Sequence, residues 1–127
     1  MTIIGIGTDI VDIRRIDNIL AKKHADHFAK RILHPSELQK FNAHPQPASY
    51  LAKRFATKEA VSKALGTGMG RFVHFNEIET YHNEQGAPNV ALHGETKAYG
   101  DKKGVGSVLV SLSDERHYAL SYIILVA

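Results

Sequence analysis

The 127-residue sequence contains no cysteine. This absence excludes a disulfide scaffold, a thiolate zinc or iron–sulfur site and a cysteine nucleophile. The chain also lacks any stretch near the ~18 consecutive apolar residues that a membrane-spanning helix requires. Residues 1–13 have no basic start and carry acids where a signal peptide would be apolar. We therefore expect a cytoplasmic protein with no membrane partner.

Two common motifs for phosphate binding and hydrolysis are missing as well. No G-x-x-x-x-G-K-S/T segment is present, which excludes a P-loop, and no G-x-S-x-G elbow is present. The glycine-rich segment 66–70 follows a predicted helix instead of opening one, so we interpret it as a helix end. His24 and His27 have helical spacing but no third ligand nearby, which favours solvent-facing side chains.

Length and charge limit the domain count and the partners. A chain of 127 residues predicts one domain, 1–127, with little room for a deep pocket inside a single subunit. The net charge of +3 and the pI near 9.2 favour an anionic partner. They are too small to indicate a nucleic-acid partner.

Apolar periodicity predicts an α+β fold, in which one long helix packs on a mostly antiparallel sheet. The Ile- and Val-rich segment 3–13 is typical of a strand buried on both faces, and short helices follow between 14 and 41. The Ala-, Leu- and Lys-rich segment 48–65 is the strongest helix candidate. The remaining elements are predicted as strands 72–81 and 91–92, a helix over 95–102, and a hairpin of strands 108–112 and 118–126.

Asp9 is an ionisable residue among small and apolar neighbours on the first strand. Alternation places it on the same face as Gly5 and Gly7. An unpaired buried carboxylate costs several kcal/mol, so another group must compensate it. It could cap the following helix, pair with Arg14 or Arg15, or bind a cation.

Glu59 is the second acid of interest, because it falls beside the apolar face of helix 48–65. Leu51 and Phe55 mark the core side of that helix, and Glu59 lies at its margin. In the simpler interpretation Glu59 forms an exposed i,i+4 ion pair with Lys63, worth a few tenths of a kcal/mol.

Asp9 and Glu59 together favour a magnesium–phosphate site. They offer two hard oxygen ligands from different elements, and Mg²⁺ takes one or two protein carboxylates with water and phosphate oxygens. Basic side chains that could neutralise the remaining phosphate charge accompany them in the sequence: Arg15, Arg54, Lys58 and Lys63.

Three segments resemble those of holo-acyl-carrier-protein synthases, the small bacterial class of 4'-phosphopantetheinyl transferases. They are GIGTDIVDI at 5–13, LAKRFATKEA at 51–60 with KALGTG at 63–68, and SDERHYA at 113–119. The resemblance covers essentially the full length in the same order. Some members carry a histidine where this chain has Leu109, so no role for that histidine is carried over.

The resemblance implies an enzyme of fatty acid biosynthesis that transfers the phosphopantetheine arm of coenzyme A to a serine of acyl carrier protein. It implies a homotrimer with active sites between subunits. It also implies that Asp9 and Glu59 bind Mg²⁺ and that Lys63 lies near the pyrophosphate, where it stabilises the leaving bisphosphate. The serine proton would pass to Glu59 or to a metal-bound water, and the sequence leaves both open.

Two further roles follow from the same resemblance. Arg54 and Phe55 fall in the stretch that lines the coenzyme A cleft. Arg15 matches a basic position associated with docking of the acidic carrier protein, and Arg14 stands beside it. Complementary charge of this kind speeds the encounter of two proteins.

Two other functions fit the residues without the resemblance. One is a magnesium-dependent pyrophosphohydrolase that uses the same two acids and water. The other is a non-catalytic nucleotide- or RNA-binding module built on the basic helices. The modest net charge and the lack of a recognition motif argue against the latter.

Overall fold

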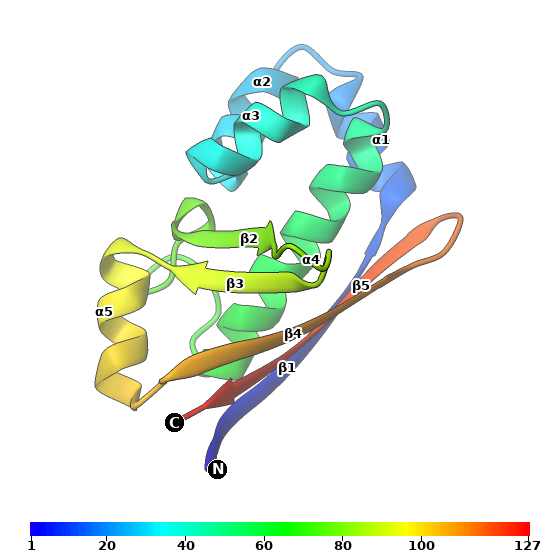
Figure 1. Cartoon of the computed structure of the whole chain (residues 1–127). Coiled ribbons are helices and arrows are strands. Elements are labelled where there is room, and N and C mark those ends of the chain that lie inside the picture. The colour runs from blue at the N-terminus through cyan, green and yellow to red at the C-terminus, as the bar shows by residue number, and fades with distance from the viewer.

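The computed structural model describes all residues 1–127, and it has the predicted α+β class with antiparallel sheets (Figure 1). The strands are β1 (Ile3–Asp12), β2 (Ile78–His82), β3 (Pro88–Leu92), β4 (Ser107–Asp114) and β5 (Tyr118–Val126). The helices are α1 (Ile13–Leu20), α2 (Ala25–Ile32), α3 (Pro35–Ala43), α4 (Pro47–Leu65) and α5 (Gly94–Lys103), with a short 3-10 helix η1 (Phe75–Glu77). No helix combines the length and the apolar character needed to cross a membrane.

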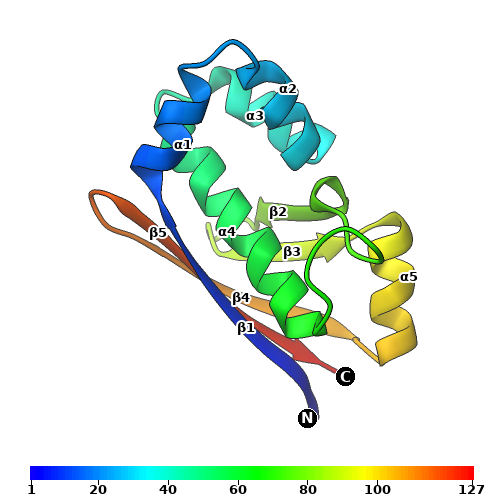
Figure 2. The same cartoon turned by 180° about the vertical axis from the view of Figure 1, so that it is seen from behind.

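The larger sheet has the strand order β1-β5-β4, and both of its pairings are antiparallel. Ser121 of β5 lies opposite Asp9 of β1 on one side and opposite Leu112 of β4 on the other. This register places Asp9 two strands away from the free edge of β4. The strands β2 and β3 form a separate hairpin, which lies between α5 and the α2–α3 pair (Figures 1 and 2).

Helix α4 crosses directly over β1 and β5. Its close approach depends on two glycines of β1. A Cβ atom at Gly5 would collide with the carbonyl oxygen of Ala64, and one at Gly7 with that of Ala60. The alternating glycines therefore let the helix backbone lie against the strand, and Asp9 follows them on the same face.

Burial on both faces of β1 was predicted, and that prediction is wrong. All five helices lie on one side of the larger sheet, so its other face has no helix over it (Figures 1 and 2). Ile6 and Ile10 are 57% and 62% exposed. Apolar residues of the neighbouring strands are exposed on the same face: Leu109, Leu120 and Tyr122. The isoleucines of β1 therefore contribute to a second apolar surface on the outer face of the sheet, which a single copy of the chain leaves exposed.

Strand β2 begins at Ile78, although a strand from residue 72 was predicted. The preceding residues form η1, and the carbonyl oxygens of Phe75 and Ile78 both accept hydrogen bonds from Nζ of Lys58. A buried ammonium on α4 thus bends the backbone around itself, a long-range contact that local periodicity does not contain.

Candidate functional site

Asp9 lies in the middle of β1, next to Lys63 of α4. Its Oδ1 accepts a hydrogen bond of 2.9 Å from Nζ of Lys63, which also donates to the carbonyl oxygen of Thr8 at 3.0 Å. The Asp9 side chain is only 17% exposed, whereas that of Lys63 is 52% exposed. The group that compensates Asp9 in the free protein is therefore a lysine 54 positions away.

The neighbouring Asp12 takes the two local roles that were considered for Asp9. It caps α1 by accepting a hydrogen bond from the backbone amide of Arg14, and it forms an ion pair of 2.8 Å with the Arg14 guanidinium. The hydrogen bonds from the Arg14 side chain lower the pKa of Asp12. Arg14 also donates to the hydroxyl of Tyr118, so its side chain is held against the sheet. Arg15 is exposed and outside every ion pair of the chain.

Glu59 is half-buried on α4, one helical turn before Lys63. Burial raises the pKa of Glu59, the nearby charge of Asp9 raises it further, and Lys63 opposes both effects. The ammonium of Lys63 pairs with Asp9 and not with Glu59. Two carboxylates and one ammonium thus gather between β1 and α4, which leaves an excess negative charge suited to a cation.

A basic cavity of about 730 Å³ opens at the β4 edge of the larger sheet. Its lining includes Lys40, His44, Lys53, Arg54 and His82. Burial lowers the pKa of His82, and the nearby charges of Arg54, Lys40 and Lys53 lower it further. Asp114 is the one acid of the lining and pairs with Lys53, so positive charge remains in excess there, which suits a phosphate-bearing ligand.

Arg54 and Phe55 are adjacent in sequence but face different surroundings. Arg54 is 4% exposed, packs its guanidinium over the Tyr50 ring at 4.4 Å, and has an Nε atom with no hydrogen-bond partner. Phe55 lies outside the cavity lining and stacks between Phe28 and Phe75, with ring centroids 6.4 and 5.4 Å away. Arg54 lines the cavity and lies 3.9 Å from the carboxylate of Glu37, whereas Phe55 belongs to an aromatic cluster of the core.

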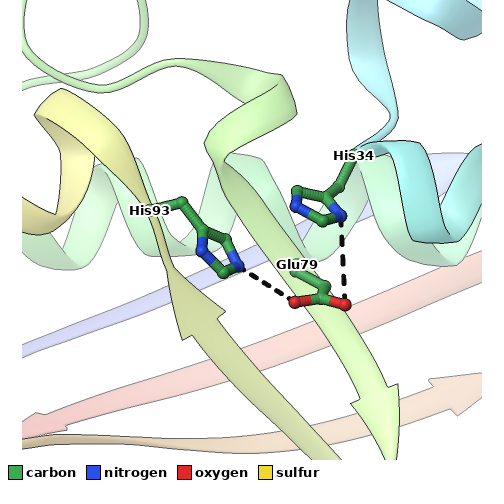
Figure 3. Close-up of side chains that lie close together, drawn as sticks. All are labelled: His34, Glu79 and His93. Atoms are coloured by element: carbon green, nitrogen blue, oxygen red, sulfur yellow. Dashed lines mark hydrogen bonds and ion pairs between the residues drawn. The ribbon is translucent and has the colours of Figure 1, made fainter.

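A polar cluster connects the start of α3 with the β2–β3 hairpin. Figure 3 shows His34 and His93 directed toward the carboxylate of Glu79. Nε2 of His93 lies 2.9 Å from Oε1 of Glu79, and Nδ1 of His34 lies 3.9 Å from Oε2. No local sequence pattern indicates this cluster, because its members come from three separate elements.

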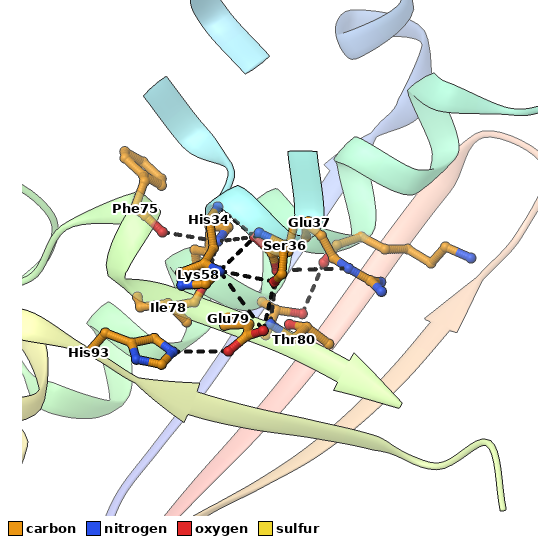
Figure 4. Close-up of polar contacts among 12 residues, drawn as sticks. His34, Ser36, Glu37, Lys58, Phe75, Ile78, Glu79, Thr80 and His93 are labelled. Atoms are coloured by element: carbon orange, nitrogen blue, oxygen red, sulfur yellow. Dashed lines mark hydrogen bonds and ion pairs between the residues drawn. The ribbon is translucent and has the colours of Figure 1, made fainter. Parts of the chain in front are cut away.

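Beside this cluster, Lys58 and Glu37 form a buried ion pair of 2.7 Å (Figure 4). Both side chains are almost fully buried, and burial lowers the pKa of Lys58. The carboxylate of Glu37 also accepts hydrogen bonds from the backbone amides of His34 and Thr80. The sequence suggested that Lys58 would neutralise phosphate charge. The structure instead directs it into the interior, where it fastens α3 and β2 to α4.

Most residues of the basic cavity were not predicted from the sequence, because they are far apart along the chain. Lys40 and His44 come from the end of α3 and the loop after it, and His82 ends β2. Only the tertiary fold brings these segments beside Arg54 of α4. The mildly basic net charge indicates an anionic ligand or partner, but it does not identify which basic residues line a cavity.

Comparison with known proteins connects this geometry to a family. Residues 5–123 match the family model of the 4'-phosphopantetheinyl transferase superfamily. The holo-(acyl-carrier-protein) synthase of Klebsiella pneumoniae strain 342 is 46% identical over 124 residues, with 98% of each chain covered.

Solved structures agree with this match. The crystal structure of holo-(acyl-carrier-protein) synthase from Neisseria meningitidis has a TM-score of 0.93 at 39% identity, and covers 99% of this chain and 100% of that one. The Helicobacter pylori enzyme in complex with coenzyme A has a TM-score of 0.83 at 32% identity, with coverages of 95% and 99%. The chain therefore belongs to the 4'-phosphopantetheinyl transferase superfamily.

Proposed function

We propose that the chain is a holo-acyl-carrier-protein synthase, which transfers 4'-phosphopantetheine from coenzyme A to a serine of apo-acyl carrier protein. The observation that carries this proposal is the match along nearly the whole chain to enzymes of that name, one of them in complex with coenzyme A. The serine oxygen attacks the phosphorus that bears the pantetheine arm. The bond to the second phosphate breaks, and adenosine 3',5'-bisphosphate leaves.

Asp9 and Glu59 are the residues we assign to a Mg²⁺ ion. They fit this ion because hard carboxylate oxygens are its preferred protein ligands. Burial raises the pKa of Glu59 and the nearby charge of Asp9 raises it further, a repulsion that a divalent cation would relieve. When bound, Mg²⁺ supplies charge neutralisation at the pyrophosphate.

We assign Lys63 to the negative charge that develops on the leaving group, and Glu59 or a metal-bound water to the proton of the attacking serine. The Lys63 ammonium is about half exposed on a flexible stem, so it can turn from Asp9 to the leaving bisphosphate and stabilise its developing charge. The attacking serine must lose its proton. Burial and the charge of Asp9 raise the pKa of Glu59 in the ion-free protein, and with Mg²⁺ bound either this carboxylate or a metal-bound water would accept the proton.

The basic cavity at the β4 edge is assigned to the nucleotide end of coenzyme A. Arg54 supports this assignment, because its Nε atom is buried, donates no hydrogen bond and has only a longer ion-pair contact of 3.9 Å with Oε2 of Glu37. Buried polar groups of this kind are costly unless a ligand or water satisfies them. Leu112 lines the cavity, and its backbone is two strand spacings, about 10 Å, from that of Asp9 across Ser121. A molecule as long as coenzyme A can bridge that distance.

We assign the apolar outer face of the sheet to contacts between three copies of the chain. Apolar side chains are exposed side by side on β1 and β5: Ile6, Ile10, Leu120 and Tyr122. A contiguous apolar patch of this kind is typical of a protein–protein interface, because its exposure to water is unfavourable. A cavity open at the edge of β4 is then completed by a neighbouring subunit. Equilibrium sedimentation should give a trimer mass, and a stable monomer at micromolar concentration would contradict this arrangement.

The function itself is tested by weighing the carrier protein. Incubation with coenzyme A, Mg²⁺ and apo-acyl carrier protein should add one phosphopantetheine group per carrier, as measured by intact-protein mass spectrometry. Loss of coenzyme A without gain on the carrier would identify a pyrophosphohydrolase. No change in either would leave a nucleotide-binding module and refute the transferase.

Docking of the acidic carrier should depend on Arg15 more than on Arg14. Arg14 is already engaged by Asp12, whereas Arg15 is exposed and unpaired. We expect Arg15→Glu to lower kcat/KM for the carrier about tenfold at low salt, with the difference shrinking as salt screens the charges. Lys102→Glu, on the exposed surface of α5, serves as a charge-matched control and should leave kcat/KM unchanged. If Arg15→Glu had the wild-type kcat/KM at low salt, Arg15 would not be part of the docking surface.

A further inference from the structure

The cluster of His34, Glu79 and His93 brings together three metal-ligating side chains that the proposed reaction does not use (Figure 3). One ligand atom from each lies within 4.8 Å of the others. The two imidazole rings stack with their centroids 4.7 Å apart and share the same carboxylate. All three residues are partly buried, so the cluster is reachable from solvent.

Each side chain of the cluster is positioned by the fold. His34 is the N-cap of α3, Glu79 lies on β2, and His93 is the N-cap of α5 directly after β3. The hydroxyl of Ser36 donates to Oε2 of Glu79 at 2.6 Å and lies 2.9 Å from Nδ1 of His34. Without a ligand, hydrogen bonds therefore hold the three groups around one point.

We propose that His34, Glu79 and His93 form a binding site for a divalent cation of the zinc class. Two imidazole nitrogens and one carboxylate oxygen are a ligand set that Zn²⁺ uses, with water in the fourth position. Mg²⁺ prefers oxygen ligands and is a poor match for this set. The Ser36 hydroxyl and the His93 ring already hold the Glu79 carboxylate in place through hydrogen bonds of 2.6 and 2.9 Å.

The side chains have to close slightly around the ion. Tetrahedral zinc with bonds of about 2.0–2.1 Å separates its ligand atoms by about 3.3 Å. The three ligand atoms lie within 4.8 Å of one another, so no pair has to approach by more than about 1.5 Å. His93 is 43% exposed, so its ring can turn without displacing the core. The inference is independent of the proposed transferase activity, because the site shares no residue with the Asp9 and Glu59 pair.

The test is a titration of the full-length protein with Zn²⁺ by calorimetry, and with Co²⁺ by visible absorption. The wild type should bind one Zn²⁺ per chain and give the intense d–d bands of four-coordinate Co²⁺. We expect Glu79→Gln and His93→Gln each to weaken Zn²⁺ binding by about 100-fold or more, since even outer partners of metal ligands contribute about 10–100-fold. His34→Asn should do the same while retaining a good helix N-cap.

Two controls decide the location of the ion. His24→Gln removes one of two exposed histidines spaced at i,i+3 on the surface, and Asp9→Ala removes the other carboxylate site. Both variants should bind Zn²⁺ as the wild type does. Failure of the wild type to bind one equivalent would overturn the proposal. So would binding that persists in Glu79→Gln and His93→Gln, or that is lost in Asp9→Ala. Circular dichroism of each variant confirms that the comparison is made between folded proteins.

Discussion

Replacing Asp9 or Glu59 by alanine is expected to lower Mg²⁺-dependent transfer by about 100-fold or more, while the chain stays folded. The physical reason is the loss of a metal ligand, and metal-ion charge stabilisation is worth several kcal/mol at about 1.4 kcal/mol per decade of rate. Neither side chain belongs to the buried core, so the free energy of unfolding should change by no more than about 1 kcal/mol. The measurements are carrier modification by mass spectrometry at saturating Mg²⁺ and thermal unfolding.

Asp101→Ala is the matched control for these variants. Asp101 also forms an ion pair with a lysine, Lys97, but on the exposed surface of α5. Its replacement should leave the transfer rate within about twofold of wild type, because exposed pairs contribute little. If Asp9→Ala and Glu59→Ala modified the carrier as fast as Asp101→Ala does, the two carboxylates would have no role in the reaction.

Gly7→Ala is expected to have the largest effect on stability, and to reduce transfer as well. The added methyl group meets the backbone carbonyl of Ala60, which cannot turn aside as a flexible side chain could. Forced overpacking of this kind costs about 1–3 kcal/mol and occasionally more, and a backbone collision belongs at the upper end. Relief requires α4 to move away from β1, which separates Glu59 from Asp9. Urea unfolding gives the stability, and the carrier assay below the unfolding transition gives the rate.

Gly86→Ala distinguishes this collision from the general effect of adding a methyl group to glycine. Gly86 has a positive φ of 83° in the β2–β3 turn, and nothing lies within 4 Å of a Cβ placed there. Its replacement should cost about 1–2 kcal/mol for the left-handed backbone and leave the transfer rate of the folded protein unchanged. Equal stability of Gly7→Ala and wild type would show that the helix does not depend on this glycine for its approach.

Several features of the fold could be predicted because they follow from local chemistry. The Ala- and Lys-rich segment gave α4 almost to the residue, and Gly66 ends it with a φ of 80°. Alternation along β1 correctly placed Gly5, Gly7 and Asp9 on one face, and the structure shows that α4 covers this face. These signals lie within a few residues of one another, so no knowledge of distant segments is needed.

Other features depend on contacts between distant segments. The partner of Asp9 is Lys63, although sequence spacing suggested that this lysine would pair with Glu59. Lys58 appeared suited to phosphate, yet it is buried against Glu37. Helix α4 is surrounded by other elements, so each of its lysines faces a different neighbour. The sequence does not indicate which of these lysines is exposed to solvent and which is buried.

By itself, the sequence determined the class of fold, the long helix, and two acids on separate elements that favour a cation beside phosphate. It could do so because glycine, alanine and carboxylate patterns act over short distances along the chain. Only the tertiary structure decided that Lys63 joins these acids, that scattered basic residues line one cavity, and that His34, Glu79 and His93 converge. Those arrangements arise from packing between elements far apart in sequence, where charge and burial are settled by the whole fold.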